Sequence, residues 1–178
     1  MNQPSKPALI LLVVLSILYC ACSSPAKTYP AIDTANEEKQ IIAMLDSFNL
    51  AAAKADFKAY FNFYTEGAIF TGTDATERWE KTAFMAWAKP IFDKGRAWDF
   101  KALERNIYFD KTGKLAWFDE LLNTQMKICR GSGVLVKEGD AWKLKQYILS
   151  TTVPNDQLDS VIKMKSHIED SIIHTFGK

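Results

Sequence analysis

Two residues of opposite charge, Asp119 and Arg130, are the strongest candidates for chemistry in this sequence. Each lies in a run of alternating apolar residues that predicts a β-strand, and a tight turn near Asn123 would place them diagonally on neighbouring strands. A carboxylate in an apolar pocket can act as a general base, because burial raises its pKa. A close arginine would lower that pKa, and Asp119 would then be a poor base near neutral pH.

Both candidates also have a purely structural interpretation. Asp119 and Arg130 could form a buried ion pair that sets strand register without taking part in a reaction. Asp74, the second candidate base, precedes Ala75, Thr76 and Glu77, and a carboxylate at this place satisfies the free N–H groups of a helix start. We therefore assign no catalytic residue, and whether the protein is an enzyme stays open, with no demonstrable activity as the expectation.

Several common catalytic arrangements are disfavoured by the residues that are missing. His167 and His174 both lie near the end of the chain, so the body of the domain lacks histidine and a Ser–His or Cys–His pair is not expected. Cys129 is alone in the body of the domain and is interpreted as a small hydrophobic residue. We expect no metal site, no disulfide and no cofactor.

The N-terminus predicts export and lipid attachment. Residues 1–21 contain one positive residue, Lys6, and a short apolar run that suits a signal peptide better than a membrane span. Cys22 follows Ala21 and resembles the acylated cysteine of a bacterial lipoprotein, although Cys20 is an alternative. Residues 22–34 are small, polar and proline-marked, and are typical of a tether.

The lipoprotein resemblance implies an outer-membrane location, facing the periplasm or the exterior, because Ser23 rather than aspartate follows Cys22. Without Lys6, the 22 basic residues become 21, which equals the 21 acidic ones. A near-neutral domain lacks the basic face that nucleic acid requires, so no nucleic-acid partner is expected. The membrane would be contacted through the lipid alone.

Helical patterns dominate the first half of the chain. Thr34 with Glu37 forms a capping-box pattern before a helix predicted over about 35–55, and Asp56 can cap a second, short helix. Residues 68–73 predict a strand, Asp74 a helix start, and 82–94 a further helix that contains Pro90. The aromatic residues in these segments, including Tyr64, Trp79 and Trp87, are by default core residues.

From residue 98 the apolar period changes to two, which predicts four consecutive strands joined by tight turns. In the first strand the alternating apolar positions shift by one residue, from Trp98 and Phe100 to Leu103 and Ile107, which indicates a β-bulge near Ala102. Pairing the last two strands about the Glu138–Asp140 turn places Val136 opposite Trp142 and Arg130 opposite Ile148. Gly131 and Gly133 are expected to leave room for Tyr147 to lie across the strand. Residues 155–178 predict an amphipathic terminal helix.

This pairing defines a predicted ligand pocket. Along the core face of the sheet, the residues would change from apolar near the turn to polar further from it. An apolar wall that ends in a few polar groups is typical of a small-molecule site. The predicted lining is Arg130, Asp119, Trp117, Ser132, Gln146, Trp79, Tyr64 and Trp87.

Four stretches resemble the SnoaL-like branch of the nuclear transport factor 2-like superfamily: GTDATERW, LAWFDE, RGSGVLVKEGDAWKLKQYILS and VPND. The resemblance covers residues 36–156 and implies an α+β, cone-shaped roll, in which a strongly curved antiparallel sheet wraps around N-terminal helices. The cone domain is expected over 35–154, with an extra C-terminal helix over 155–178. Relatives include enzymes and binding domains, so the fold alone does not specify a reaction.

Three functions remain open from the sequence. The leading hypothesis is a lipid-anchored domain that binds a small, largely apolar ligand in the cone. The second is an isomerase, dehydratase or cyclase that uses a carboxylate base. The third is a non-catalytic assembly domain, a homodimer paired through exposed apolar residues of the sheet, for which Phe118, Leu122 and Leu149 are the candidates.

Overall fold

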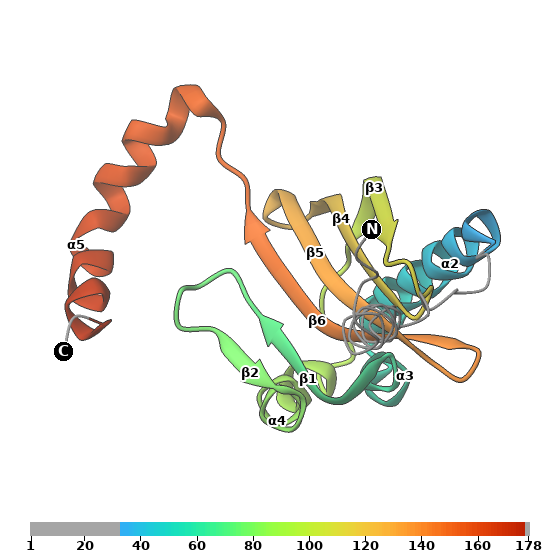
Figure 1. Cartoon of the computed structure of the whole chain (residues 1–178). Helices are drawn as coiled ribbons and strands as arrows, with labels where there is room; N and C mark the ends of the chain where they lie inside the picture. Colours follow the sequence, from blue (N-terminus) through green and yellow to red (C-terminus); the bar gives the residue numbers. More distant parts are fainter. Residues whose placement is uncertain (1–32, 177–178) are drawn as a thin grey trace, which may run out of the picture. The chain divides into compact units, whose positions relative to one another are not determined.

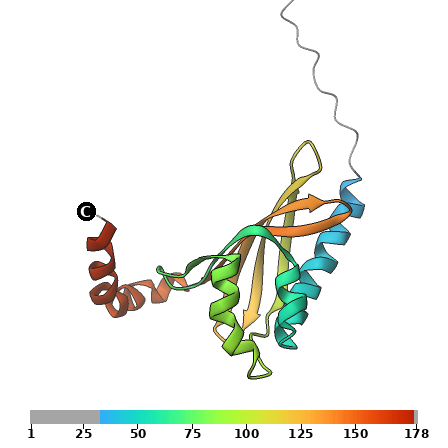
Figure 2. The same cartoon turned by 90° about the horizontal axis from the view of Figure 1, so that it is seen from below.

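The computed structural model describes residues 33–176, which form an α+β domain with three helices on one face of a curved sheet (Figures 1 and 2). This confirms the predicted fold class. The predicted signal peptide, Cys22 and nearly all of the tether lie outside the described residues. Among the helices that are described, none combines the length and the apolar character needed to cross a membrane.

The three helices that cover the sheet are α2 (Thr34–Ala53), α3 (Phe57–Asn62) and α4 (Lys81–Phe92), close to the predicted ranges. Asp56 caps α3 as predicted, since its carboxylate accepts a hydrogen bond from the Ala59 N–H at 2.9 Å. The cap of α2 is Asp33 rather than Thr34, and its carboxylate accepts from the Asn36 N–H.

The capping-box prediction for Glu37 is wrong, because its carboxylate turns away from the helix start. It accepts hydrogen bonds from Lys137 Nζ at 2.5 Å and from Trp142 Nε1 at 2.7 Å. Only 13% of the Glu37 side chain is exposed. The glutamate thus links the start of α2 to two strands that lie about a hundred residues further along the chain.

Glu37→Gln is expected to destabilise the domain by about 1–3 kcal/mol at neutral pH, since it removes charge from two hydrogen bonds. The Lys137 hydrogen bond is the main reason that the pKa of Glu37 lies below its ordinary value of 4.5. A carboxylate with a lowered folded-state pKa stabilises above the unfolded-state pKa and loses that contribution as pH falls through the folded one. Urea unfolding should therefore show the difference from wild type shrinking below about pH 4.5.

The exposed neighbour Glu38 offers a matched control for this experiment, since Glu38→Gln makes the same charge change on the same turn. We expect that control to change stability by less than about 0.5 kcal/mol. An equal loss in both variants would contradict a specific role for Glu37.

The sheet contains β1 (Tyr64–Thr71), β2 (Arg78–Glu80), β3 (Lys101–Phe109), β4 (Leu115–Thr124), β5 (Lys127–Glu138) and β6 (Ala141–Thr151), in the order β2-β1-β6-β5-β4-β3. The antiparallel meander β3–β6 is confirmed. The bulge is confirmed as well, by a register shift between Ala102 and Glu104. The sheet as a whole is mixed, however, because β1 pairs parallel to β6.

The core between the helices and the sheet is unusually aromatic. Tyr60, Tyr64 and Phe84 are at most 3% exposed, and each touches several further rings. A buried side chain of this size contributes about 1.5–3 kcal/mol through removal of apolar surface from water. The helices are held on the concave face of the sheet chiefly by these rings.

The chain ends in η2 (Asn155–Gln157) and α5 (Leu158–Phe176), where a terminal helix was predicted. None of the residues of α5 is buried, so the predicted apolar stripe on it, which includes Ile162 and Ile168, makes no part of the core. His167 and His174 are exposed, as predicted.

Candidate functional site

The pairing of β5 with β6 differs from the predicted register by one residue near the turn. Trp142 lies opposite Lys137 rather than Val136, because Gly139 and Asp140 form a two-residue turn with Gly139 at φ +62°. A second shift follows between Val134 and Leu135. A one-residue slip moves every side chain of a strand to the opposite face of the sheet.

The predicted sheet lining of the pocket is therefore wrong. The alternation of burial along β4 and β5 places the core on the opposite residue set, which includes Phe118, Gly131 and Leu135. The residues that were predicted to face the pocket lie instead on the outer face of the sheet: Trp117, Asp119, Arg130, Ser132 and Gln146.

The predicted pair of Arg130 and Asp119 does not form in the described part of the chain. Arg130 is exposed and lies opposite Ser150, while Asp119 accepts a hydrogen bond from Asn106 Nδ2 at 3.3 Å. Neither residue lines the interior of the cone, so Asp119 lacks the apolar surroundings that would make it a base.

Asp74 does not start a helix, although it caps a local structure. Its carboxylate accepts hydrogen bonds from the Thr76 N–H at 2.8 Å and from the Thr76 hydroxyl at 2.6 Å, which closes a turn. These two bonds hold the pKa of the fully exposed Asp74 below its ordinary value. An exposed carboxylate with a lowered pKa is a poor general base, which argues against the second catalytic candidate.

The interior of the cone contains a cavity of about 160 Å³. Helices α2–α4 contribute Phe48, Tyr60, Phe84 and Trp87, and the segment before β3 contributes Trp98 and Phe100. The remaining lining comes from the sheet and its loops: Phe70, Gly72, Thr73, Glu77, Gln125, Met126, Tyr147 and Leu149. Of the predicted lining residues, Trp87 alone belongs to this set. Tyr64 meets the lining residue Phe48 edge to face, and Trp79 stacks on Trp87.

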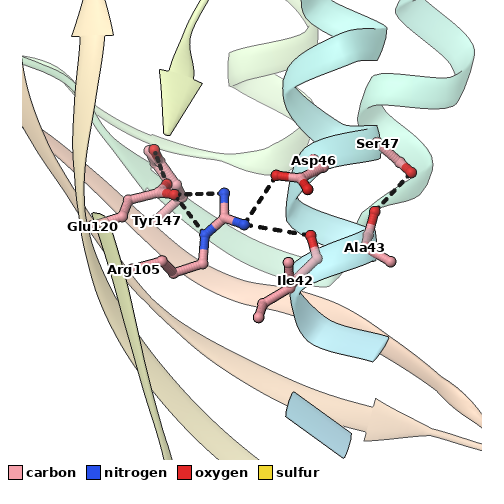
Figure 3. A network of polar contacts seen from close by, with 7 residues as sticks. All are labelled: Ile42, Ala43, Asp46, Ser47, Arg105, Glu120 and Tyr147. Carbon is pink, nitrogen blue, oxygen red and sulfur yellow. Dashed lines mark hydrogen bonds and ion pairs between the residues drawn. The ribbon is translucent and has the colours of Figure 1, made fainter. Parts of the chain in front are cut away.

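A buried polar network lies behind Tyr147 at one wall of the cavity (Figure 3). The Tyr147 hydroxyl donates to Glu120 Oε1 at 3.1 Å, and Arg105 Nε donates to Glu120 Oε2 at 2.9 Å. Arg105 Nη1 reaches α2, where it donates to Asp46 at 3.0 Å. The side chains of Arg105 and Glu120 are 7% and 1% exposed.

The geometry of this network leaves one buried group without a hydrogen bond. Arg105 Nη2 lies 2.8 Å from Glu120 Oε2 but is poorly directed for donation, so the contact there is an ion pair. Burial raises the pKa of Glu120, and the charge of Arg105 opposes that rise without overcoming it. The network joins α2, β3, β4 and β6 through groups that cannot be removed singly without leaving a buried partner.

Residues 41–154, more than half of the chain, match the SnoaL-like domain family. The chain belongs to this family. No curated protein matches the sequence.

Solved structures similar to this SnoaL-like domain share its fold at low sequence identity. An NTF2-like protein of unknown function from Pseudomonas putida KT2440 is 14% identical, with a TM-score of 0.59 over 71% of this chain and 94% of that one. A proposed dehydratase of the NTF2-like family from Streptomyces avermitilis is 13% identical, with a TM-score of 0.58 over 68% and 99%. A proposed scytalone dehydratase from Novosphingobium aromaticivorans is 14% identical, with a TM-score of 0.57 over 67% and 87%.

The hydroxyl groups beside the cavity of the SnoaL-like domain are already engaged with one another. Tyr60 and Tyr64 share a hydrogen bond of 3.2 Å between their hydroxyls, and the Tyr147 hydroxyl donates a hydrogen bond to Glu120. Burial raises the pKa of each of these tyrosines well above the ordinary value, so all three stay protonated. They serve as structural donors and not as bases.

A larger groove of about 690 Å³ lies between α3 and α4 of the SnoaL-like domain, but its chemistry is that of an ordinary surface. It is bordered by the charged residues Asp56, Lys58, Glu66 and Lys81, and Lys81 lies 3.7 Å from Glu66. Such mutually neutralising charges are typical of a solvated face. The smaller aromatic cavity is the better candidate site.

The residues that were predicted to pair two sheets also lie elsewhere. Phe118, Leu122 and Leu149 are at most 6% exposed and belong to the core of the SnoaL-like domain. The outer face of the sheet instead exposes Tyr108 and Trp117, each 44% accessible and stacked at 5.8 Å. Homodimer formation through the sheet stays a prediction, although the three residues that were predicted to mediate it lie in the core.

Sequence reasoning missed Arg105 and Glu120 as interior residues. One signal for Glu120 was available: every second residue of a strand lies on the same face, and this places Glu120 on the face of three apolar residues, Ala116, Phe118 and Leu122. The opposite face, which includes Trp117, was an equally plausible core face because LAWFDELL has large apolar residues on both faces.

Proposed function

We propose that this SnoaL-like domain binds a small, largely apolar ligand inside the cone. The observation that carries the proposal is the cavity of about 160 Å³, which eight aromatic side chains line. Apolar cavities with a few polar groups at the rim are the usual form of small-molecule sites. This volume is below the range for drug-sized molecules, so the ligand is expected to be about the size of one ring.

Binding without reaction is favoured over carboxylate catalysis. The buried carboxylate behind Tyr147, that of Glu120, already accepts hydrogen bonds from Tyr147 and Arg105, and the Glu77 carboxylate in the cavity lining is only partly buried. The names of two structural neighbours include a dehydratase activity, but at 13–14% identity the similarity concerns the fold.

We expect indole and cyclohexanol to bind with dissociation constants in the millimolar range or below, as measured by saturation-transfer NMR or calorimetry. Met126 lies at the cavity and is 37% exposed, so Met126→Trp should fill the opening and weaken both ligands at least about tenfold. Met164 on α5 is 73% exposed and lies outside the cavity, which makes Met164→Trp the matched control. Absence of binding by both probes to the wild-type protein would refute the proposal.

We also infer that the mature protein is attached to the outer membrane through a lipid on Cys22. The support is the signal-peptide pattern of residues 1–21 together with the small residue Ala21 before the cysteine. Mass spectrometry of the N-terminal peptide of the processed protein would test this, and an unmodified Cys22 within an uncleaved chain would exclude it.

A further inference from the structure

The cavity lining contains one carboxylate side chain, that of Glu77. Its carboxylate lies directly over Gly72, since a methyl group on Gly72 would stand 2.1 Å from Glu77 Oε2. Within residues 33–176 no lysine, arginine or histidine forms an ion pair with Glu77, and its carboxylate accepts one long hydrogen bond, from the Asp74 N–H at 3.3 Å. The rim of the cavity therefore carries a negative charge without a cation beside it.

The loop before β2 holds Glu77 in this place. The Gly72 N–H donates to the Glu77 carbonyl at 2.9 Å, and the Glu77 N–H donates to the Asp74 carbonyl at 3.0 Å. The turn that Asp74 and Thr76 form closes the same loop. These backbone bonds hold Glu77 beside Gly72, and both residues belong to the cavity lining.

Most of the cavity wall beside this carboxylate is made of aromatic side chains. Phe70 and Phe84 stack with their centroids 4.1 Å apart, and Trp98 lies nearly parallel to Phe84, with an interplanar angle of 18°. Trp87 stacks on Phe84 from the exposed side, at 5.9 Å. The face of an aromatic ring carries partial negative charge and attracts cations, most strongly in the case of tryptophan.

We propose that the cavity selects a small organic cation, with a quaternary or protonated ammonium group held by the aromatic lining and the Glu77 carboxylate. Both parts of the site favour positive charge, and no lysine or arginine lines the cavity to attract an anion. The volume of about 160 Å³ corresponds to roughly five water molecules, the scale of a trimethylammonium group with a short substituent. The inference rests on the proposed function, because it names the ligand class of the same cavity.

The test compares choline with its neutral isostere 3,3-dimethylbutan-1-ol, which replaces the ammonium nitrogen by carbon and keeps the shape. Calorimetry with the full-length protein is expected to show choline binding about tenfold more tightly than the isostere. Glu77→Gln should weaken choline at least about fivefold and leave the isostere unchanged. Glu138→Gln makes the same charge change at the β5–β6 turn, remote from the cavity lining, and should alter neither ligand.

The possible outcomes separate the ligand class from the binding function. If choline binds no more tightly than the isostere, or if Glu138→Gln weakens choline as much as Glu77→Gln does, the cation proposal is overturned. Indole and cyclohexanol can still bind in that case, which would leave the proposed binding function intact. Failure of all four compounds to bind the wild-type protein would remove both proposals.

Discussion

Arg105→Met is expected to destabilise the domain by about 3–5 kcal/mol, because it leaves the Glu120 carboxylate buried without its cation. The Glu120 side chain is 1% exposed, and Arg105 is its partner at 2.8–2.9 Å. Urea unfolding at neutral pH would measure the loss. Asp46→Asn, which removes the third charge of the network, should cost less than about 1 kcal/mol, since Asp46 is 62% exposed.

A double variant distinguishes loss of the ion pair from loss of packing. Arg105→Met with Glu120→Gln removes both charges and keeps an acceptor for the Tyr147 hydroxyl. We expect this variant to recover about 2 kcal/mol or more relative to Arg105→Met alone. If the double variant is as unstable as the sum of the single ones, the two charges are not coupled and the interpretation is wrong.

The Arg105→Met variant should also respond to pH with a defined sign. Burial already raises the pKa of Glu120 above its ordinary value of 4.5, and removal of Arg105 takes away the charge that opposes this rise. A raised folded-state pKa means that the folded protein binds the proton more tightly, so stability increases as pH falls through that pKa. The stability difference from wild type is therefore expected to shrink on mild acidification.

Gly131→Ala is expected to destabilise the domain by about 2–4 kcal/mol. A methyl group on Gly131 would stand 2.5 Å from the Tyr147 hydroxyl oxygen and 2.9 Å from Glu120 Oε1, both buried and hydrogen-bonded to each other. Overpacking a core costs about 1–3 kcal/mol, and loss of the hydrogen bond adds about 1 kcal/mol. Thermal or urea unfolding would show the effect.

Removal of the clashing atom tests this explanation. Tyr147→Phe deletes the hydroxyl, so Gly131→Ala should cost less in the Tyr147→Phe background than in the wild-type protein. Ser132→Ala, on the outer face of the same strand, provides a control that should change stability by less than about 1 kcal/mol. A change below about 0.5 kcal/mol for Gly131→Ala would mean that the network moves easily to accept the methyl group.

The position of Gly131 was partly predictable from sequence. The sequence predicts that Gly131 and Gly133 both leave room for Tyr147 across the strand, and the contact of Gly131 with the Tyr147 hydroxyl confirms this for Gly131. The second glycine, Gly133, makes room mainly for Phe118 and for the backbone of β6. The prediction was therefore correct that β5 and its neighbours pack closely at both glycines, but Tyr147 is the partner of Gly131 only.

The sequence by itself determined the class of fold, the near-neutral charge, and the order of the helices and strands apart from the short strand β2. Apolar periodicity carries this information locally, as does the chemistry of residues such as Asp56 and Gly139. The sequence also shows that histidine is absent from the body of the domain, which disfavours a Ser–His or Cys–His catalytic pair.

Only the tertiary structure decided which face of each strand is buried. In GVLVK on β5 and LAWFDELL on β4, large apolar residues lie on both faces of the strand, so either face could have been buried in the core. A two-residue turn and one bulge then shift the register, and each one-residue shift exchanges the two faces. For this reason Glu120 lies inside and Arg130 outside, although their local sequences favour neither arrangement.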